Sequence, residues 1–275
     1  MKTLSVSSTI LIAAFLTLVT GSVMGQELRR ITYNNVGVDV VIDRPGNRLV
    51  DVIIAFHGTV ATDDNIIPAA QNMLTKVKEI TDRTDVMIVS VAYPQENRLF
   101  GDGIREAEAA LLWVKEKSWK ELRRKVRKIF LVGHSQGGYM VTRLATMHTT
   151  DGVIANGPGP LNLVFRCGLE ESGQVVQGAV CTLLRQTYGT TAANPSAYMA
   201  CSLLSFNGGY KSDILFVQGM QDSPIQMYSW PTFKQQVSDR TNCRGRQFLE
   251  VANGIHTALF DTAEARTAYN SFINR

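Results

Sequence analysis

The stretch KIFLVGHSQGGYM, residues 128–140, decides the fold. Its apolar first half is typical of a short strand buried on both faces, and a helical pattern begins near its end, at Tyr139. The motif GHSQG at residues 133–137 therefore has the strand, turn and helix context that gives G-x-S-x-G its meaning. A Cβ at Gly133 or Gly137 would collide in so tight a turn. The pattern predicts that Ser135 stands clear of the sheet as an exposed nucleophile.

The rest of the chain alternates strand and helix patterns around this turn. Two exposed strands are expected at 30–36 and 38–43, buried strands at 51–56, 86–92 and 128–132, and three more strands at 151–155, 213–218 and 247–252. Helices are expected at 66–80, 103–119, 139–148, 229–237 and 262–273. Because each crossover between parallel strands is covered by a helix, the alternation predicts an α/β fold with helices on both faces of a mostly parallel sheet.

One segment, from Gly157 to Lys211, interrupts the alternation. It contains Gly, Pro and Asn and three of the four cysteines, and it is too long for a plain connection. We expect a cap insertion at about 157–211, covering one edge of the sheet. Its aromatic residues either shape the substrate pocket or form the core of the cap: Phe165, Tyr188 and Tyr198.

A serine hydroxyl is a poor nucleophile at neutral pH, so Ser135 needs a histidine to take its proton and a carboxylate to orient that histidine. On this fold the partners follow the serine in the order acid, then histidine. Asp222 lies in the loop after the strand at 213–218, and His256 lies in the loop after the last strand. Both loops are at the carboxyl ends of strands, where ligands meet open α/β sheets. We expect Ser135, Asp222 and His256 to form a catalytic triad.

Each partner has a structural alternative. Asp222 could instead cap the turn or helix that follows, since Asp is common before Ser-Pro. Asp213 begins a strand and would lie at the opposite edge of the sheet. Three other histidines lack the required position: one fills the middle of the motif, one lies on or just past a helix, and one belongs to the turn after the strand at 51–56. These are His134, His148 and His57, respectively.

Acyl transfer also needs donors for the developing oxyanion. These are usually the backbone N–H after the nucleophile and an N–H from the loop after an early strand. Gln136 and Thr59 occupy those two places, and the small Gly58 lets the backbone approach a substrate closely. The alternative is that His57-Gly58 is only a turn. We expect Thr59 and Gln136 to form the oxyanion hole.

With these motifs in order, residues 30–275 resemble the α/β-hydrolase superfamily. The resemblance rests on His57-Gly58, GHSQGG, the GMQD loop ending at Asp222 and the GIH loop ending at His256. GGYM after the nucleophile and DSP, which begins with the acid Asp222 and precedes a helix, most resemble in motif the small secreted esterases related to the prolyl-oligopeptidase catalytic domain. The resemblance implies an eight-stranded, mostly parallel sheet and neither a metal nor an organic cofactor.

The N-terminus has the pattern of a secretory signal peptide. Met1-Lys2 is followed by an apolar stretch at 9–19 and by small residues ending at Gly25. The alternative is a membrane anchor, but the stretch is shorter than the about 20 residues that cross a bilayer. We expect residues 1–25 to be removed, leaving a secreted or periplasmic protein without a membrane span. The α/β-hydrolase domain would be residues 26–275.

The four cysteines should then lie in an oxidising compartment, where an even number favours disulfides. They are Cys167, Cys181, Cys201 and Cys243. Two disulfides are expected, and the sequence does not choose among the three possible pairings. A zinc site is not indicated, because the spacings contain no C-x-x-C pair.

Composition and charge restrict the partners. The 275 residues are 45% hydrophobic and 19% charged, with a net charge of +4, as in ordinary globular proteins. Apart from a basic run at 115–128, the positive charges are scattered, so no nucleic-acid partner is indicated. The oligomeric state is not encoded in any pattern that we find.

The motifs together predict a serine hydrolase that cleaves small-molecule carboxylic esters through an acyl-enzyme. The alternatives are a peptidase of the prolyl-oligopeptidase type, an acyltransferase with the same triad, and an inactive binding protein on the same fold. Such peptidases carry a large N-terminal propeller, for which the few residues between the signal peptide and the first strand leave no room. Inactive relatives have usually lost a triad member, and none is missing here.

Overall fold

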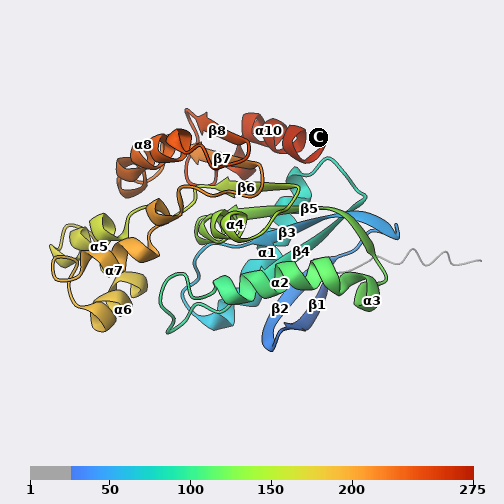
Figure 1. Cartoon of the computed structure of the whole chain (residues 1–275), viewed down its shortest axis with the longest axis horizontal. Helices are drawn as coiled ribbons and strands as arrows, with labels where there is room; N and C mark the ends of the chain where they lie inside the picture. Colours follow the sequence, from blue (N-terminus) through green and yellow to red (C-terminus); the bar gives the residue numbers. More distant parts are fainter. Residues whose placement is uncertain (1–25) are drawn as a thin grey trace, which may run out of the picture.

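The computed structural model describes residues 26–275, so the predicted signal peptide lies outside the described residues. Eight strands form one sheet, in the spatial order β1-β2-β4-β3-β5-β6-β7-β8 (Figure 1). The strands are β1 Glu27–Tyr33, β2 Val36–Asp43, β3 Leu49–Phe56, β4 Val86–Ala92, β5 Lys125–His134, β6 Gly152–Asn156, β7 Ile214–Gly219 and β8 Arg246–Val251. β2 pairs antiparallel with β1 and β4, and every other pairing in the sheet is parallel. The expected eight-stranded, mostly parallel α/β sheet is confirmed.

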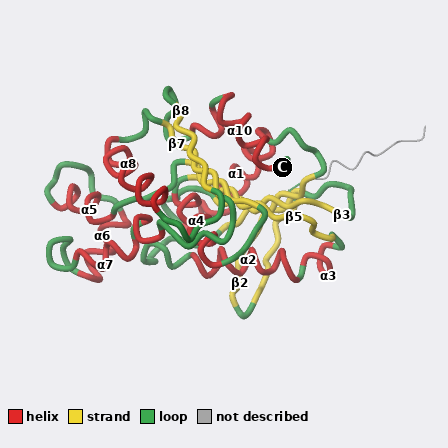
Figure 2. The backbone as a smooth tube through the Cα atoms, turned by 45° about the horizontal axis from the view of Figure 1, so that its top comes forward, coloured by secondary structure: helices red, strands yellow, loops and turns green. Residues whose placement is uncertain are grey.

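Helices cover both faces of this sheet, which forms the central layer in Figure 2. α2, α4 and α8 pack on one face and α1, α9 and α10 on the other. Their bounds are α1 Ile66–Ile80, α2 Ile104–Glu116, α4 Gln136–Met147, α8 Pro224–Asp239, α9 Ala258–Asp261 and α10 Ala263–Ile273. Within β3, Val52, Ile54 and Phe56 join the first core, whereas Ile53 and Ala55 join the second. An almost continuous apolar run is therefore needed, because successive side chains enter opposite cores.

Two expectations about single elements are wrong. β2 was expected to be exposed, but it lies between β1 and β4, and Val40, Val41 and Ile42 are fully buried. The helix expected at 103–119 is divided into α2 and the short α3, Ser118–Leu122. Ser118 Oγ donates to the carbonyl of Val114 (2.7 Å), a bond that competes with helix continuation.

The segment between β6 and β7 forms α5 Leu163–Glu171, α6 Ala179–Tyr188, α7 Pro195–Cys201 and the 3₁₀ turn η2 Leu203–Phe206. These helices gather beside one end of the sheet, at the left of Figure 1. A disulfide between Cys167 and Cys181 joins α5 to α6. The expected second disulfide is absent from residues 26–275: Cys201 ends α7, Cys243 lies in the connection before β8, and both are free and half-buried.

None of the helices in the described part of the chain combines the length and the apolar character that crossing a membrane requires.

A buried ion cluster fastens the amino-terminal edge of the sheet. Asp51 in β3 is 1% exposed. Its carboxylate accepts hydrogen bonds from Arg127 Nε (2.7 Å) and Nη2 (2.8 Å) and pairs with Arg83 Nη1 (2.7 Å). Burial alone would raise the pKa of Asp51, but the hydrogen bonds and charges of the two arginines lower it below its ordinary value. The cluster links β3, β5 and the connection before β4.

Replacing this carboxylate should destabilise the protein in a pH-dependent way. Asp51→Asn leaves Arg127 without its anion and Arg83 with only the exposed Asp85, so the free energy of unfolding at pH 7 should fall by about 3 kcal/mol. Because the folded pKa is lowered, the stabilisation is present above the unfolded pKa of about 3.9 and is lost as the pH falls through the folded value. Urea unfolding at neutral and acidic pH measures both effects.

Asp85→Asn is the matched control, since Asp85 also pairs with Arg83 but its side chain is 44% exposed. We expect it to cost less than about 1 kcal/mol. Equal losses for the two variants would contradict the role given to the buried carboxylate.

Candidate active site

Ser135 lies at the junction of β5 and α4 in a conformation rare for a residue with a side chain, with φ at 56° and ψ at −117°. Such a conformation costs on the order of 1–3 kcal/mol and persists only where the surroundings impose it. Here the turn is enclosed by backbone: a Cβ on Gly133 would overlap the carbonyl of Gly137, and a Cβ on Gly137 would overlap that of Phe56. The Ser135 N–H also donates to the carbonyl of Asn156 (2.9 Å).

Asp222 and His256 meet through a short hydrogen bond, with His256 Nδ1 at 2.7 Å from Asp222 Oδ2. They come from the loops after β7 and β8, which are joined by the hydrogen bond from Gln221 N to Gly254 O (2.8 Å). The Asp222 side chain is only 4% exposed, whereas that of His256 is 38% exposed. Buried carboxylate and accessible imidazole therefore form one unit at the carboxyl edge of the sheet.

The charge of Asp222 is stabilised despite its burial. Burial alone would raise its pKa, but hydrogen bonds from His256 and Gln218 and the backbone N–H of Ser223 outweigh it and lower the pKa. Gln218 Nε2 lies 3.0 Å from Oδ2, and the Ser223 N–H lies 2.6 Å from Oδ1. The helix α8 that follows is capped by Ser223, whose side chain accepts the N–H of Gln226. Asp222 therefore stays ionised and directed at His256.

Ser135, His256 and Asp222 line one cavity of about 680 Å³, together with Thr59. Within residues 26–275 the Ser135 hydroxyl makes no hydrogen bond, so it is free to contact a ligand in this cavity. Hydrogen bonds between such a hydroxyl and an imidazole often tighten only when substrate is bound. The structure thus brings all three residues to one cavity and joins two of them by a hydrogen bond.

The backbone N–H groups of Thr59 and Gln136 have no hydrogen-bond partner among the described residues. Gln136 begins α4, where helix N–H groups lack partners within the helix. The Thr59 hydroxyl donates to Gln136 Oε1 (2.9 Å), which fastens the loop after β3 to the start of α4. A Cβ on Gly58 would lie 3.3 Å from the Cβ of Ser135, so this loop runs close beside the serine.

The other histidines are held neutral or lie elsewhere. Burial lowers the pKa of His57 to about 4, and its ring stacks on Tyr93 with a centroid separation of 4.5 Å. Burial and the neighbouring His256 lower the pKa of His134 to about 3. His148 pairs with Glu108 (2.6 Å) and does not line the cavity.

Two buried amides that the sequence analysis did not single out hold the site together. Asn156, at the end of β6, lies 2.9 Å from His134 Nδ1, donates to His256 O (3.2 Å) and accepts the N–H of Leu259 (3.1 Å). Gln218, near the end of β7, donates to Asp222 and accepts from Gln226 Nε2 (3.1 Å). Their signal in the sequence is a polar residue at the end of an apolar strand pattern.

Removing one of these amides should loosen the site. Gln218→Leu deletes the donor to Asp222 and removes one hydrogen bond each from Gln226 Nε2, which keeps the carbonyl of Pro158, and from the carbonyl of Gly219, which keeps the N–H of Asp222. We expect the free energy of unfolding to fall by about 1–3 kcal/mol and the pKa of Asp222 to rise. Urea unfolding and NMR titration of the carboxyl measure these effects. The control Gln235→Leu, on the exposed face of α8, should change stability by less than about 0.5 kcal/mol. An unchanged Asp222 pKa would contradict the role of Gln218.

Solved structures of hydrolases share this fold. Acylaminoacyl peptidase of Pyrococcus horikoshii aligns with a TM-score of 0.64 at 14% identity, over 91% of this chain and 41% of that one. Est1E of Butyrivibrio proteoclasticus aligns with 0.61 at 15% identity, over 90% and 97%. The Pyrococcus furiosus esterase Pf2001 aligns with 0.66 at 13% identity, over 92% and 91%. This chain therefore spans about two fifths of the peptidase but nearly the whole of Est1E and of Pf2001.

Sequence comparison gives the family. No curated protein sequence matches the chain. Residues 53–196, more than half of the chain, match the alpha/beta hydrolase fold family. The matched segment runs from β3 into α7 and contains the strained turn at Ser135. By sequence and by architecture, this chain belongs to the alpha/beta hydrolase fold family.

Proposed function

We propose that this protein is a serine hydrolase that cleaves carboxylic esters through an acyl-enzyme intermediate. One observation carries the proposal: the strained Ser135 turn opens into the same cavity as His256, whose Nδ1 is hydrogen-bonded to the buried Asp222 carboxylate. Nucleophile, base and orienting acid are the three groups that acyl transfer by serine requires.

In the first half of the reaction, Ser135 Oγ attacks the ester carbonyl carbon while His256 Nε2 takes the hydroxyl proton. Asp222 accepts the Nδ1–H of His256, fixes the tautomer that leaves Nε2 free, and stabilises the imidazolium. As the tetrahedral intermediate collapses, His256 gives its proton to the departing alkoxide. The products of this half are an alcohol and an acyl group esterified to Ser135.

The N–H groups of Thr59 and Gln136 would stabilise the oxyanion of this intermediate. Each lacks another partner among the described residues, and the Thr59–Gln136 side-chain hydrogen bond (2.9 Å) holds the two segments together. Loss of one such donor typically costs about 3 kcal/mol of transition-state stabilisation. The positive end of the α4 dipole adds to the same field.

In the second half, water replaces the alcohol. His256 removes a proton from water, the hydroxide attacks the acyl carbon, and the second tetrahedral intermediate expels Ser135 Oγ, which recovers its proton from His256. The net reaction is ester plus water giving carboxylic acid plus alcohol. A small-molecule ester suits the cavity, whose apolar lining includes Leu161, Val180, Ile225 and Ile255. The fold neighbour Pf2001 is itself named as an esterase.

We also propose that the protein acts outside the cytoplasm after loss of residues 1–25. The Cys167–Cys181 disulfide supports this location, because structural disulfides persist in oxidising compartments.

Ser135→Ala should abolish ester hydrolysis while leaving the fold intact. Release of p-nitrophenol from p-nitrophenyl butyrate measures activity, and circular dichroism measures folding. A fluorophosphonate probe should modify Ser135 in the wild type, as located by peptide mapping, and should not label the variant. Ser205→Ala, at an exposed serine of η2, is the control and should retain activity. Comparable turnover by Ser135→Ala, or labelling elsewhere in the cavity such as at Ser223, would overturn the assignment.

Asp222→Asn should lower kcat by roughly 10⁴-fold, because the amide favours the tautomer with the proton on the wrong nitrogen of His256. The variant should still bind substrate, so most of the loss should be in kcat. Asp239→Asn, at the exposed end of α8, should match the wild type. Retention of more than about a tenth of the wild-type kcat would show that Asp222 does not orient His256.

A further inference from the structure

The cap helix α5 places a guanidinium in the wall of the Ser135 cavity. Arg166 lines this cavity, and it is the one lysine or arginine among the described residues that do so. The other ionisable side chains of the lining are Asp222 and His256, which are bonded to each other. The mechanism above assigns no task to Arg166.

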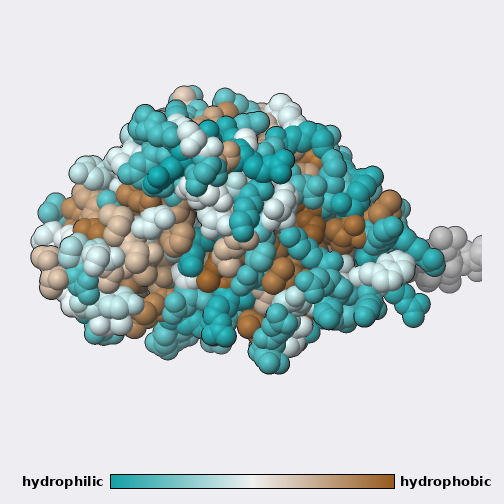
Figure 3. Space-filling model, in the orientation of Figure 1, coloured by the Kyte–Doolittle hydropathy of each residue, from teal (hydrophilic) through white to brown (hydrophobic). Residues whose placement is uncertain are grey.

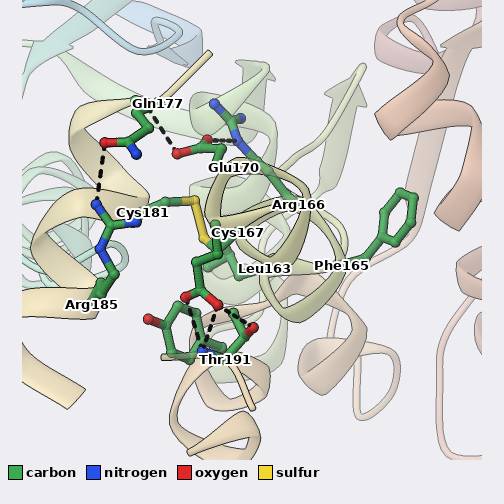
Figure 4. The surroundings of a disulfide bond; sticks show 12 residues. Leu163, Phe165, Arg166, Cys167, Glu170, Gln177, Cys181, Arg185 and Thr191 are labelled. Carbon is green, nitrogen blue, oxygen red and sulfur yellow. Dashed lines mark hydrogen bonds and ion pairs between the residues drawn. A yellow bond between two sulfur atoms is a disulfide. The ribbon is translucent and has the colours of Figure 1, made fainter. Parts of the chain in front are cut away.

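Contacts on the side away from the cavity fix the position of Arg166. Glu170, one turn later in α5 and 2% exposed, lies 3.3 Å from Arg166 Nε through Oε1 and accepts the N–H of Gly178 through Oε2 (2.9 Å). Figure 4 shows Arg166 and Glu170 extending from α5, beside the disulfide that joins Cys167 to Cys181. The residue next to Arg166 is thus covalently tied to α6, so the guanidinium is held before any ligand arrives.

The outer end of the guanidinium is free. Neither Nη atom of Arg166 has a hydrogen-bond partner within residues 26–275, and the side chain is 39% exposed. Asn162, the N-cap of α5, precedes Arg166 by four residues, and both line the cavity. Asn162 Oδ1 caps the helix by accepting the Phe165 N–H (3.0 Å), while its Nδ2 donates to none of the described residues. Two side chains with unused N–H donors therefore line one cavity.

The surroundings of Arg166 favour a ligand that carries a negative charge. Residues of apolar character gather over α5, α6 and α7 at the left of Figure 3. Glu170, which balances the charge, does not line the cavity, so a ligand meets the positive end of the pair. The planar fork of an arginine matches the two oxygens of a carboxylate, and such charge-assisted hydrogen bonds are stronger than neutral ones.

We propose that Arg166, assisted by Asn162, binds a carboxylate carried by the substrate, so that the preferred substrates are esters with a free carboxylate remote from the scissile bond. The inference rests on the ester hydrolysis proposed above. The carboxylate can be part of the acyl group or of the alcohol, because the Ser135 cavity is lined by the cap on one side and by the Asp222 and His256 loops on the other.

Paired substrates test both positions. For the acyl side, the mono-p-nitrophenyl ester of adipic acid is compared with its methyl-capped diester. For the alcohol side, 4-carboxyphenyl butyrate is compared with its methyl ester, with the phenol measured by chromatography. We expect the wild type to prefer the free carboxylate in at least one pair. Arg166→Gln should lower kcat/KM for that substrate about tenfold, mostly by raising KM. It should change kcat/KM for the methyl-capped partner less than about twofold.

Arg166→Lys is a second variant, which keeps the charge but loses the fork, and it should retain part of the preference. Arg185→Gln is the matched control: Arg185 lies on α6, bonds Gln177 (3.3 Å) and does not line the cavity, so the preference should persist. The rate of fluorophosphonate labelling of Ser135 shows whether each variant keeps an intact site.

Two failures are distinguishable. If the wild type cleaves neither member of any pair, the proposed ester hydrolysis fails. If the wild type cleaves both members equally well, the proposed carboxylate site is wrong but the proposed ester hydrolysis is not. The same conclusion follows if Arg166→Gln and Arg166→Lys lower kcat/KM equally for both members of a pair while labelling remains normal. Loss of labelling in both Arg166 variants would show Arg166 to be structural and would also overturn the proposed site.

Discussion

The turn between β5 and α4 is the constraint on which the rest of the structure depends. Ser135 keeps a backbone conformation that it would rarely adopt alone, because β5 and α4 are pressed against the end of β3. Two glycines make this approach possible, since any side chain at either position would meet a backbone carbonyl. The strain cost is offset by the cooperative packing of the sheet, whose β3 and β5 are buried among helices on both faces.

The two edges of the sheet have different chemistry. At the amino-terminal edge, a buried carboxylate and two arginines form an ion cluster far from the cavity. At the carboxyl edge, buried amides hold the structure together instead: Asn156 and Gln218 hydrogen-bond to the loops that carry His256 and Asp222. Neutral amides suit this edge because they satisfy buried polar groups without adding a charge that would compete for the imidazole.

The inserted segment between β6 and β7 completes the site without altering the sheet. Its helices contribute one wall of the cavity, and the disulfide between α5 and α6 fixes them to each other. The catalytic machinery that we propose comes from the ends of strands, whereas the guanidinium of Arg166 comes from this segment. In these two proposals, chemistry and substrate choice depend on different parts of one chain, so each can vary separately.

The sequence by itself determined the order of strands and helices, the mostly parallel sheet and the tight turn at Ser135. It also predicted Asp222 and His256, whose side chains are hydrogen-bonded to each other. Each of these depends on local periodicity or on motif order. Tertiary structure alone decided that β2 is buried, that α2 ends before Ser118, that Cys167 pairs with Cys181 while two cysteines stay free, and that Asn156, Gln218 and Arg166 surround the site. These features depend on contacts between residues distant in the chain, and no local pattern records which distant groups will meet.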